Sequence, residues 1–254
     1  MSAIRAIAML TFREAIRNKI LYLFLVFAIV MISFSWILKE ITVGDELKIV
    51  KDLGISSIHF FGVLITIFIG INLIFKEMEK RTIYLVLSKP VRRYQFLLGK
   101  FFGLAFTLLL VLCGLVAIFY LILVLKGASS PRLLLSFDMI YLEWLLIAAI
   151  AILFSSFSTP LLSTMMTLAC FFAGHLSESL LMLRQNVGSE MGNAFLSILF
   201  YALPNLELFN IRSILVHNLP LANAYIGETT IYWVFYISAL LLLSIQIFHK
   251  RDFV

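Results

Sequence analysis

Long apolar runs alternate with short polar stretches along most of the chain. Six of these runs approach or exceed the ~20 residues that a helix needs to cross the hydrocarbon core of a bilayer. They predict an all-α membrane protein with six transmembrane helices in one domain, 1–254. The predicted spans are 20–38, 54–75, 101–125, 139–157, 161–183 and 229–248.

The N-terminal segment 1–19 has a different pattern. Ile4, Ile7, Thr11 and Ala15 recur at helical spacing, while arginines lie on another face. An apolar stripe beside cationic residues is typical of a helix that lies in the membrane interface. We therefore expect an amphipathic interfacial helix here.

The segment 184–228 contains apolar pieces that are too short to cross a membrane. Pro204 and Pro220 interrupt them. Short apolar pieces beside spans are commonly interfacial or re-entrant helices, so we expect short outer re-entrant helices. The polar residues Asn205, Glu207, Asn210 and Arg212 are expected to organise this segment through hydrogen bonds.

The segment 76–100 is the longest charged stretch of the chain. Its first part favours a short amphipathic helix that Pro90 ends, and its second part leads into the span at 101. The pattern predicts a helix–turn–helix elbow beneath the membrane. Two uses remain open: the elbow rests among lipid headgroups, or it docks into a groove on a cytoplasmic partner.

The composition supports a lipid environment. Hydrophobic residues make up 62% of the chain and charged residues 13%, with a mean hydropathy of +1.05; soluble chains are about 45–50% apolar. The net charge of +6 does not indicate nucleic-acid binding, because the basic residues flank apolar runs. Their concentration in 1–19, in 76–100 and at the chain end predicts that both termini are cytoplasmic.

Aromatic residues near the predicted span ends are expected to lie at the membrane–water interface. They are Tyr141, Trp144, Tyr225, Tyr232 and Trp233. Gly99 and Gly103 form a GxxxG spacing, which permits close helix approach but is common by chance.

Few residues within the spans suggest chemistry. Asn72 is expected to hydrogen-bond another helix or to contact a substrate. His175 and Glu178 share a helical face. They are candidates for a pathway or an ion pair, or they lie close enough to the outer interface to be in contact with water, which is the slightly favoured interpretation. Zinc takes three or four ligands, so this pair alone predicts no metal site, and the depth of His59 and His217 is too uncertain to add them. Cys113 and Cys170 lie in apolar runs without a CxxC partner and predict neither zinc nor a disulfide framework.

The elbow carries a family resemblance. Its order Glu-x-Glu-x-Arg-Thr-Ile, then Leu-Ser-Lys-Pro-Val-x-Arg, then Leu-Gly-Lys resembles the elbow between the second and third spans of ABC type 2 (ABC-2) exporter-class permeases. The closest likeness is to the copper-enzyme maturation subgroup. Six spans and a short turn at Ser158-Thr159-Pro160 also fit. Many relatives have Gly-Thr where this chain has Arg81-Thr82.

The resemblance implies a half-transporter in a prokaryotic cytoplasmic membrane. Two permeases would pair, and each would engage a separate ABC ATPase through the elbow, called the coupling helix. The implied ATPase contacts are Glu77, Glu79, Arg81 and Thr82, with Leu85 and Leu87 packing beside them. The chain has no GxxxxGK[ST] sequence, so ATP and Mg²⁺ would bind to the partner ATPase. We expect the chain itself to bind no cofactor and to be no enzyme.

Three alternatives differ in their expected signals. An ATP-independent secondary transporter or channel predicts charged residues near mid-span, and a membrane enzyme predicts a cluster of His, Asp or Glu; the sequence suggests neither. A third alternative keeps the ATPase but transmits mechanical motion to an outer accessory protein through 184–228. The substrate, the transport direction, and a homodimer versus a heterodimer of permeases are left open.

Overall fold

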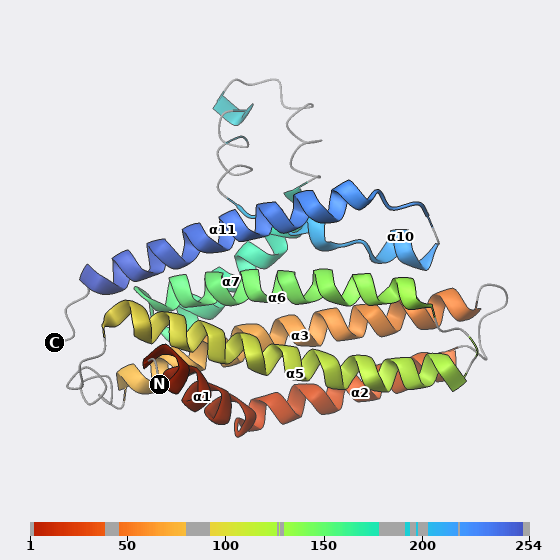
Figure 1. The fold of residues 1–254 in the computed structure, drawn as a ribbon, viewed down its shortest axis with the longest axis horizontal. Helices are drawn as coiled ribbons and strands as arrows, with labels where there is room; N and C mark the ends of the chain where they lie inside the picture. The colour runs from red at the N-terminus through yellow and green to blue at the C-terminus, as the bar shows by residue number, and fades with distance from the viewer. Residues whose placement is uncertain are drawn as a thin grey trace.

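A computed structural model describes residues 3–38, 46–79, 92–125, 127, 130–177, 191–193, 197, 203–217 and 219–250. Throughout these residues the regular structure is helical, and the long helices run side by side along the long axis of the molecule (Figure 1). The main elements are α1 (Ala3–Ile16), α2 (Lys19–Leu38), α3 (Glu46–Glu79), α5 (Arg93–Leu125), α6 (Leu134–Ser155), α7 (Pro160–His175) and α11 (Asn223–Lys250). Short helices in the described part of the chain include η2 (Pro131–Leu133), η3 (Glu207–Phe209) and α10 (Arg212–Val216).

The helices confirm a multi-pass membrane protein. Among the described residues, four helices are long and apolar enough to cross a membrane: α3, α5, α6 with η2, and α11. The pair α1 and α2, bent by 59°, makes a fifth if it is taken as one span. α7 is apolar but has only 16 residues, fewer than the ~20 that a bilayer needs. The six separate spans that we predicted are therefore not confirmed.

Several helix boundaries differ from the predicted ones. α3 begins at Glu46 rather than at 54, α5 at Arg93 rather than at 101, and α6 at Leu134 rather than at 139. Hydropathy identifies only the apolar part of a helix. Lys, Arg and Glu are good helix formers, so a helix can extend beyond that part. These helices therefore continue through polar residues that we had assigned to loops.

α7 ends earlier than predicted, at His175 rather than at 183. The described part of segment 184–228, which we call the outer segment after its predicted side, lies directly against the last turn of α7. There the amide of Leu206 donates to the carbonyl oxygen of Gly174 at 3.2 Å. A Cβ atom on Gly174 would lie 2.7 Å from the carbonyl oxygen of Pro204. The missing side chain thus lets the segment approach α7 closely.

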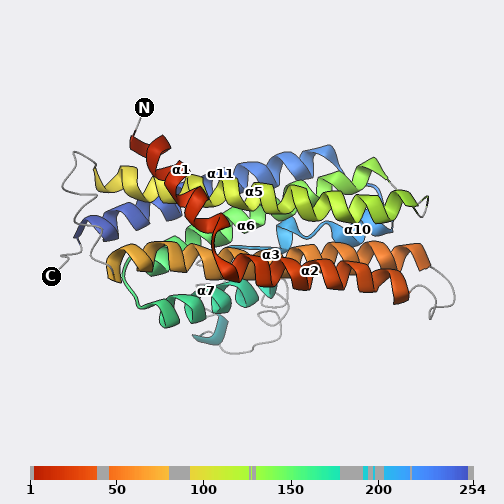
Figure 2. The same ribbon diagram turned by 90° about the horizontal axis from the view of Figure 1, so that it is seen from below.

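α6 is the central helix of the bundle. It contacts α3, α5, α7 and α11, and Figures 1 and 2 show it between α11 and the layer that contains α3. Most of its side chains are buried, and its apolar residues are spread around its whole circumference, as expected of a helix packed on several sides. α11 instead exposes a row of apolar side chains that suits contact with lipid.

The N-terminal helix α1 packs closely on α5 (Figure 2). A Cβ atom on Gly99 would lie 2.7 Å from Cβ of Ile7, and one on Gly103 would lie 2.6 Å from the carbonyl oxygen of Ala8. The GxxxG spacing in α5 therefore forms a contact surface for α1. The interfacial location of α1 remains a prediction.

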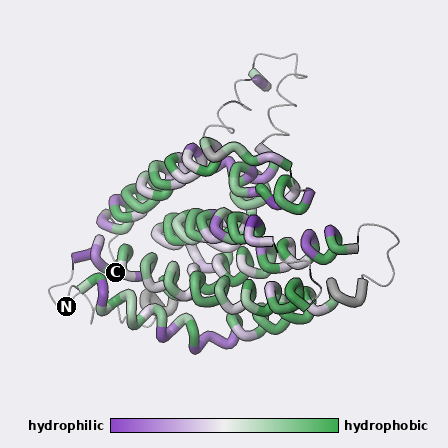
Figure 3. The backbone as a smooth tube through the Cα atoms, turned by 45° about the vertical axis from the view of Figure 1, so that its right-hand side comes forward, coloured by the Kyte–Doolittle hydropathy of each residue, from purple (hydrophilic) through white to green (hydrophobic). Residues whose placement is uncertain are grey.

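Polar residues lie mostly toward the two ends of the bundle, whereas apolar residues fill the lengths of the helices (Figure 3). α1, the last turn of α11 and the helix ends at Glu79 and Arg93 lie together at one end (Figure 1). α10 and the start of α3 lie toward the opposite end. This distribution separates a basic end, next to segment 76–100, from an end that carries the outer segment.

Candidate functional site

Three helices bring titratable side chains together inside the bundle. His59 comes from α3, Glu143 from α6 and His175 from α7. Nε2 of His59 lies 2.8 Å from Oε2 of Glu143, and Nε2 of His175 lies 3.0 Å from Oε1 of the same carboxylate. The rings of His59 and His175 meet edge to face, 5.6 Å apart. We call these three residues the His–Glu–His cluster.

Glu143 is the most deeply buried member of this cluster. Only 1% of its side chain is exposed, against 23% for His59 and 21% for His175. At 1.5 Å per residue, Glu143 lies about 13 Å from the start of α6 and about 18 Å from its end. Burial of an unpaired carboxylate is costly, and the two imidazole partners of Glu143 offset this cost.

Trp144 fixes the neighbouring turn of α6. Its side chain is fully buried, and a Cβ atom on Gly62 would lie 1.6 Å from its ring. Gly62 lies close to His59 on α3. A glycine on one helix and a large ring on the other therefore set the separation between α3 and α6 beside the cluster.

The outer segment adds a second carboxylate. Oε2 of Glu207, in η3, lies 3.2 Å from Nδ1 of His175, and its Oε1 accepts a 2.8 Å hydrogen bond from the amide group of Asn210. The backbone amide of Glu207 donates to Oδ1 of Asn205 at 3.1 Å. The predicted loop-organising role of these residues is confirmed, but Glu207 also reaches the transmembrane cluster.

Arg212 attaches the same segment to α3 through an ion pair and a hydrogen bond. Nε of Arg212 lies 3.0 Å from Oδ1 of Asp52, and its guanidinium also donates to the hydroxyl of Ser56. The charge of Arg212 is thus balanced near the start of α3, away from the carboxylate of Glu143. α11 holds the segment from the other side, because the Tyr225 hydroxyl donates to the carbonyl of Leu208 and the Tyr232 hydroxyl accepts from the amide of Asn205.

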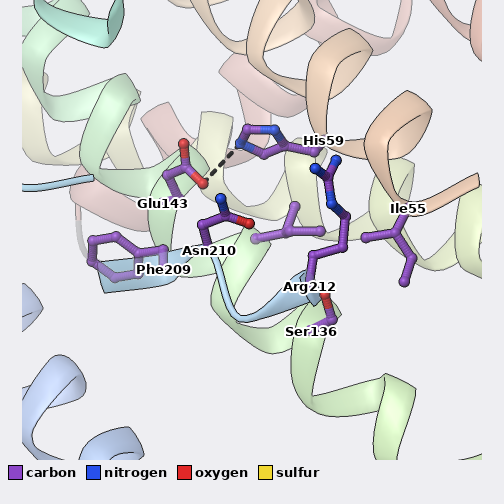
Figure 4. Close-up of a pocket in the computed structure, with 8 residues that line it drawn as sticks. Ile55, His59, Ser136, Glu143, Phe209, Asn210 and Arg212 are labelled. Carbon is purple, nitrogen blue, oxygen red and sulfur yellow. Dashed lines mark hydrogen bonds and ion pairs between the residues drawn. The ribbon is translucent and has the colours of Figure 1, made fainter. Parts of the chain in front are cut away.

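A small cavity opens beside the cluster (Figure 4). It measures about 20 Å³, which is room for one water molecule or one ion. Glu143 and His59 form one side of it, and Asn210, Arg212 and Phe209 of the outer segment approach from the other. The remaining lining residues are Ile55, Ser136 and Ile140.

The basic end of the bundle holds a second group of contacts, between α5, α11 and α1. Nη1 of Arg93 donates to the carbonyl oxygens of Phe248 at 3.1 Å and His249 at 2.7 Å. The rings of Phe96 and Phe248 stack 5.9 Å apart. Nζ of Lys100, only 2% exposed, lies 3.5 Å from a carboxylate oxygen of Glu14 in α1. The first turns of α5 are thereby attached to both α11 and α1.

A family model described as ABC-2 family transporter protein matches residues 5–253. The chain belongs to the ABC-2 transporter family. It is therefore the permease component of an ABC transporter, and such permeases normally work with an ATPase subunit. A search of the curated proteins gave no significant match. The copper-enzyme maturation subgroup stays a prediction.

The predicted coupling residues of this ABC-2 permease lie at the edge of the described chain. Glu77 and Glu79 belong to the last turn of α3, and their side chains are outside the described residues. Arg81, Thr82, Leu85 and Leu87 lie wholly outside them. Their contact with an ATPase remains a prediction.

The two predicted pathway residues that the structure describes, Asn72 and His175, lie in different parts of the permease. Asn72 donates to the carbonyl of Phe68 at 2.8 Å, within its own helix, rather than to a neighbouring helix as we expected. His175 belongs to the cluster described above, whereas its predicted partner Glu178 lies outside the described residues.

Sequence reasoning missed Glu143 and wrongly expected no cluster of His and Glu in the permease. The signal was available, because Glu143 is the single acidic residue in the predicted span 139–157. Trp144 was expected at the interface but is buried in the bundle. Tyr141 and Trp233 likewise use their polar atoms inside the protein, on the carbonyls of Ala105 and Leu142.

Proposed function

We propose that this permease receives ATP-driven motion from a separate ATPase through segment 76–100 and uses it to export a substrate. Two copies would pair, each with its own ATPase subunit. The observation that carries the proposal is the attachment of the α5 end of this segment to both α1 and α11.

The helices on either side of segment 76–100 are suited to act as levers. α3 has 34 residues and α5 has 33, so each is about 50 Å long at 1.5 Å per residue. The hydrocarbon core of a bilayer is only about 30 Å thick. Both helices therefore extend beyond the membrane, and segment 76–100 joins them at the basic end.

The contacts at that end favour movement of several helices as a unit. Arg93 holds two terminal carbonyls of α11, and Lys100 pairs with Glu14 of α1. A displacement of the first turns of α5 would pull on these neighbours, because packed helices transmit strain rather than absorb it. This geometry supports a coupling role more than a passive rest among lipid headgroups.

Orientation and assembly rest on the sequence. The concentration of Lys and Arg near segment 76–100 favours the cytoplasmic side for this end, and with it both termini. The resemblance to exporter-class permeases favours a pair of identical permeases in a prokaryotic inner membrane. It equally allows motion to be passed to an outer accessory protein through 184–228.

One observation favours the alternative hypothesis of an ATP-independent transporter. That hypothesis predicts ionisable residues at membrane depth, and the His–Glu–His cluster supplies them. Family membership still favours an ATP-driven subunit.

Co-purification with the ATPase tests the coupling role. The double variant Glu77→Lys, Glu79→Lys reverses the charge of the predicted contact, and we expect it to lose the ATPase during affinity purification. The variant Glu228→Lys is a matched control, since Glu228 is exposed at the start of α11, the end opposite Lys250. Unchanged assembly and unchanged ATP turnover in the double variant would count against the proposal.

A further inference from the structure

We propose that His59, Glu143 and His175 bind a divalent transition-metal ion of the zinc class within the membrane part of this permease. One ligand atom from each of the three residues lies within 4.8 Å of the other two. The inference stands apart from the coupling role, because it concerns a different part of the bundle and needs no ATPase.

The donor set and its spacing suit such an ion. Two imidazoles and one carboxylate form a ligand set that zinc uses, with bonds of about 2.0–2.2 Å. In a tetrahedral arrangement these bonds place the ligand atoms about 3.3 Å apart. The two hydrogen-bonded pairs already lie at 2.8 and 3.0 Å, so small side-chain movements would bring three donors around one ion.

The surroundings of His175 provide a second argument. Its Nε2 faces Glu143, and its Nδ1 faces Glu207. A histidine that binds a metal through one ring nitrogen usually donates its other N–H to a carboxylate or a carbonyl. Asn210 in turn holds Glu207 at 2.8 Å, so the carboxylate that orients His175 is itself fixed.

Charge also favours a divalent cation. The carboxylates of Glu143 and Glu207 lie on either side of His175, and Glu143 is almost completely buried. One divalent ion would balance two carboxylates at a depth where unbalanced charge is costly. The cation nearest the cavity, Arg212, is already paired with Asp52.

The cavity indicates an exchangeable site. Three protein ligands leave a fourth position, as in zinc sites that bind water or a substrate. The cavity of about 20 Å³ touches His59 and Glu143 and has room for that fourth ligand. The bound ion would join α3, α6 and α7 and, through Glu207, the outer segment.

Metal binding to the purified permease tests the inference. The chelator-treated protein in detergent is titrated with Co²⁺, whose visible absorption reports a tetrahedral site, and then with Zn²⁺ as competitor. We expect one ion per chain, displaced by Zn²⁺, and a melting temperature that rises with the bound ion. Failure of the wild-type protein to take up a stoichiometric ion would overturn the proposal.

Variants assign the site to its residues. Glu143→Gln keeps the shape but removes the anionic ligand, and we expect it to abolish Co²⁺ binding. Glu207→Gln removes only the orienting carboxylate and should weaken binding by about 10–100-fold. His217→Gln is the matched control, because His217 is exposed and contacts only the Ser213 carbonyl among the described contacts.

Equal affinity in the Glu143→Gln and His217→Gln proteins would also overturn the proposal. If Glu143→Gln does not fold, the assignment is decided by His59→Gln, a change at a partly exposed position. Binding to His59→Gln with wild-type affinity would contradict the site as described.

Discussion

Glycines mark the residues at which helices of this permease approach most closely. A Cβ atom on Gly103 would lie 2.6 Å from the backbone of α1, and one on Gly62 would overlap the ring of Trp144. Membrane helices associate through such close packing, because lipid gives no hydrophobic drive to bring them together. The contact between α1 and α5 thus depends on the absence of side chains at the glycines of α5.

The substitution Gly103→Ala should destabilise the protein. The added methyl group meets the Ala8 carbonyl and the Thr11 side chain, and overpacking of this kind costs about 1–3 kcal/mol. Gly114→Ala in the same helix is the matched control, since nothing lies within 4 Å of its added Cβ. Thermal unfolding in detergent measures both. Equal melting temperatures for the two variants would show that α1 does not pack against Gly103.

Glu143 shows what a single residue can reveal before a structure is known. One acidic residue in an otherwise apolar run signals a functional position, because it must find a partner. The sequence contains this signal, but it does not name the partner. His59 and His175 lie 84 and 32 positions away, and only the packing of α3 and α7 on α6 brings them within reach.

At the scale of elements, α5 connects the basic end to the rest of the bundle. It follows segment 76–100, carries α1 on its glycine surface and is joined to α11 through Arg93 and Phe96. Hydropathy predicted its apolar part well. It did not predict the start at Arg93, since polar helix formers extend the helix beyond the lipid.

The substitution Arg93→Ala should loosen the end of α11. The last carbonyls of a helix have no partner within it, and Arg93 supplies donors to two of them, on Phe248 and His249. We expect faster amide hydrogen exchange in the last two turns of α11, measured by mass spectrometry. Arg132→Ala, an exposed change next to α6, should leave this exchange unchanged. Equal protection in both variants would remove the proposed link between α5 and α11.

Element type was easier to predict than element position. The apolar runs predicted six helices, and each run is helical over most of its described residues. The outer segment was harder, because Glu207 and Arg212 have local polar neighbours and distant partners alike. Local spacing indicates the first kind of contact. The distant partners, His175 for Glu207 and Asp52 for Arg212, come within reach only after the chain has folded.

At the scale of the whole molecule, two sites lie in different parts of one bundle. The basic end carries the contacts between α5, α11 and α1, while the His–Glu–His cluster lies between α3, α6 and α7 and is in contact with Glu207 of the outer segment. α3 contributes to both, because it runs from Asp52 and His59 to its end beside segment 76–100. Motion at one site therefore has a continuous helical path toward the other.

The central claim is that segment 76–100 faces the cytoplasm and meets the ATPase there. The most direct measurement is accessibility of a single cysteine, Leu87→Cys, in a protein whose Cys113 and Cys170 have been replaced by serine. Leu219→Cys, exposed near α10, reports the opposite side. A membrane-impermeant thiol reagent should label position 87 only in inside-out vesicles, with protection by added ATPase, and position 219 only in right-side-out vesicles. Labelling of position 87 in right-side-out vesicles would contradict the account.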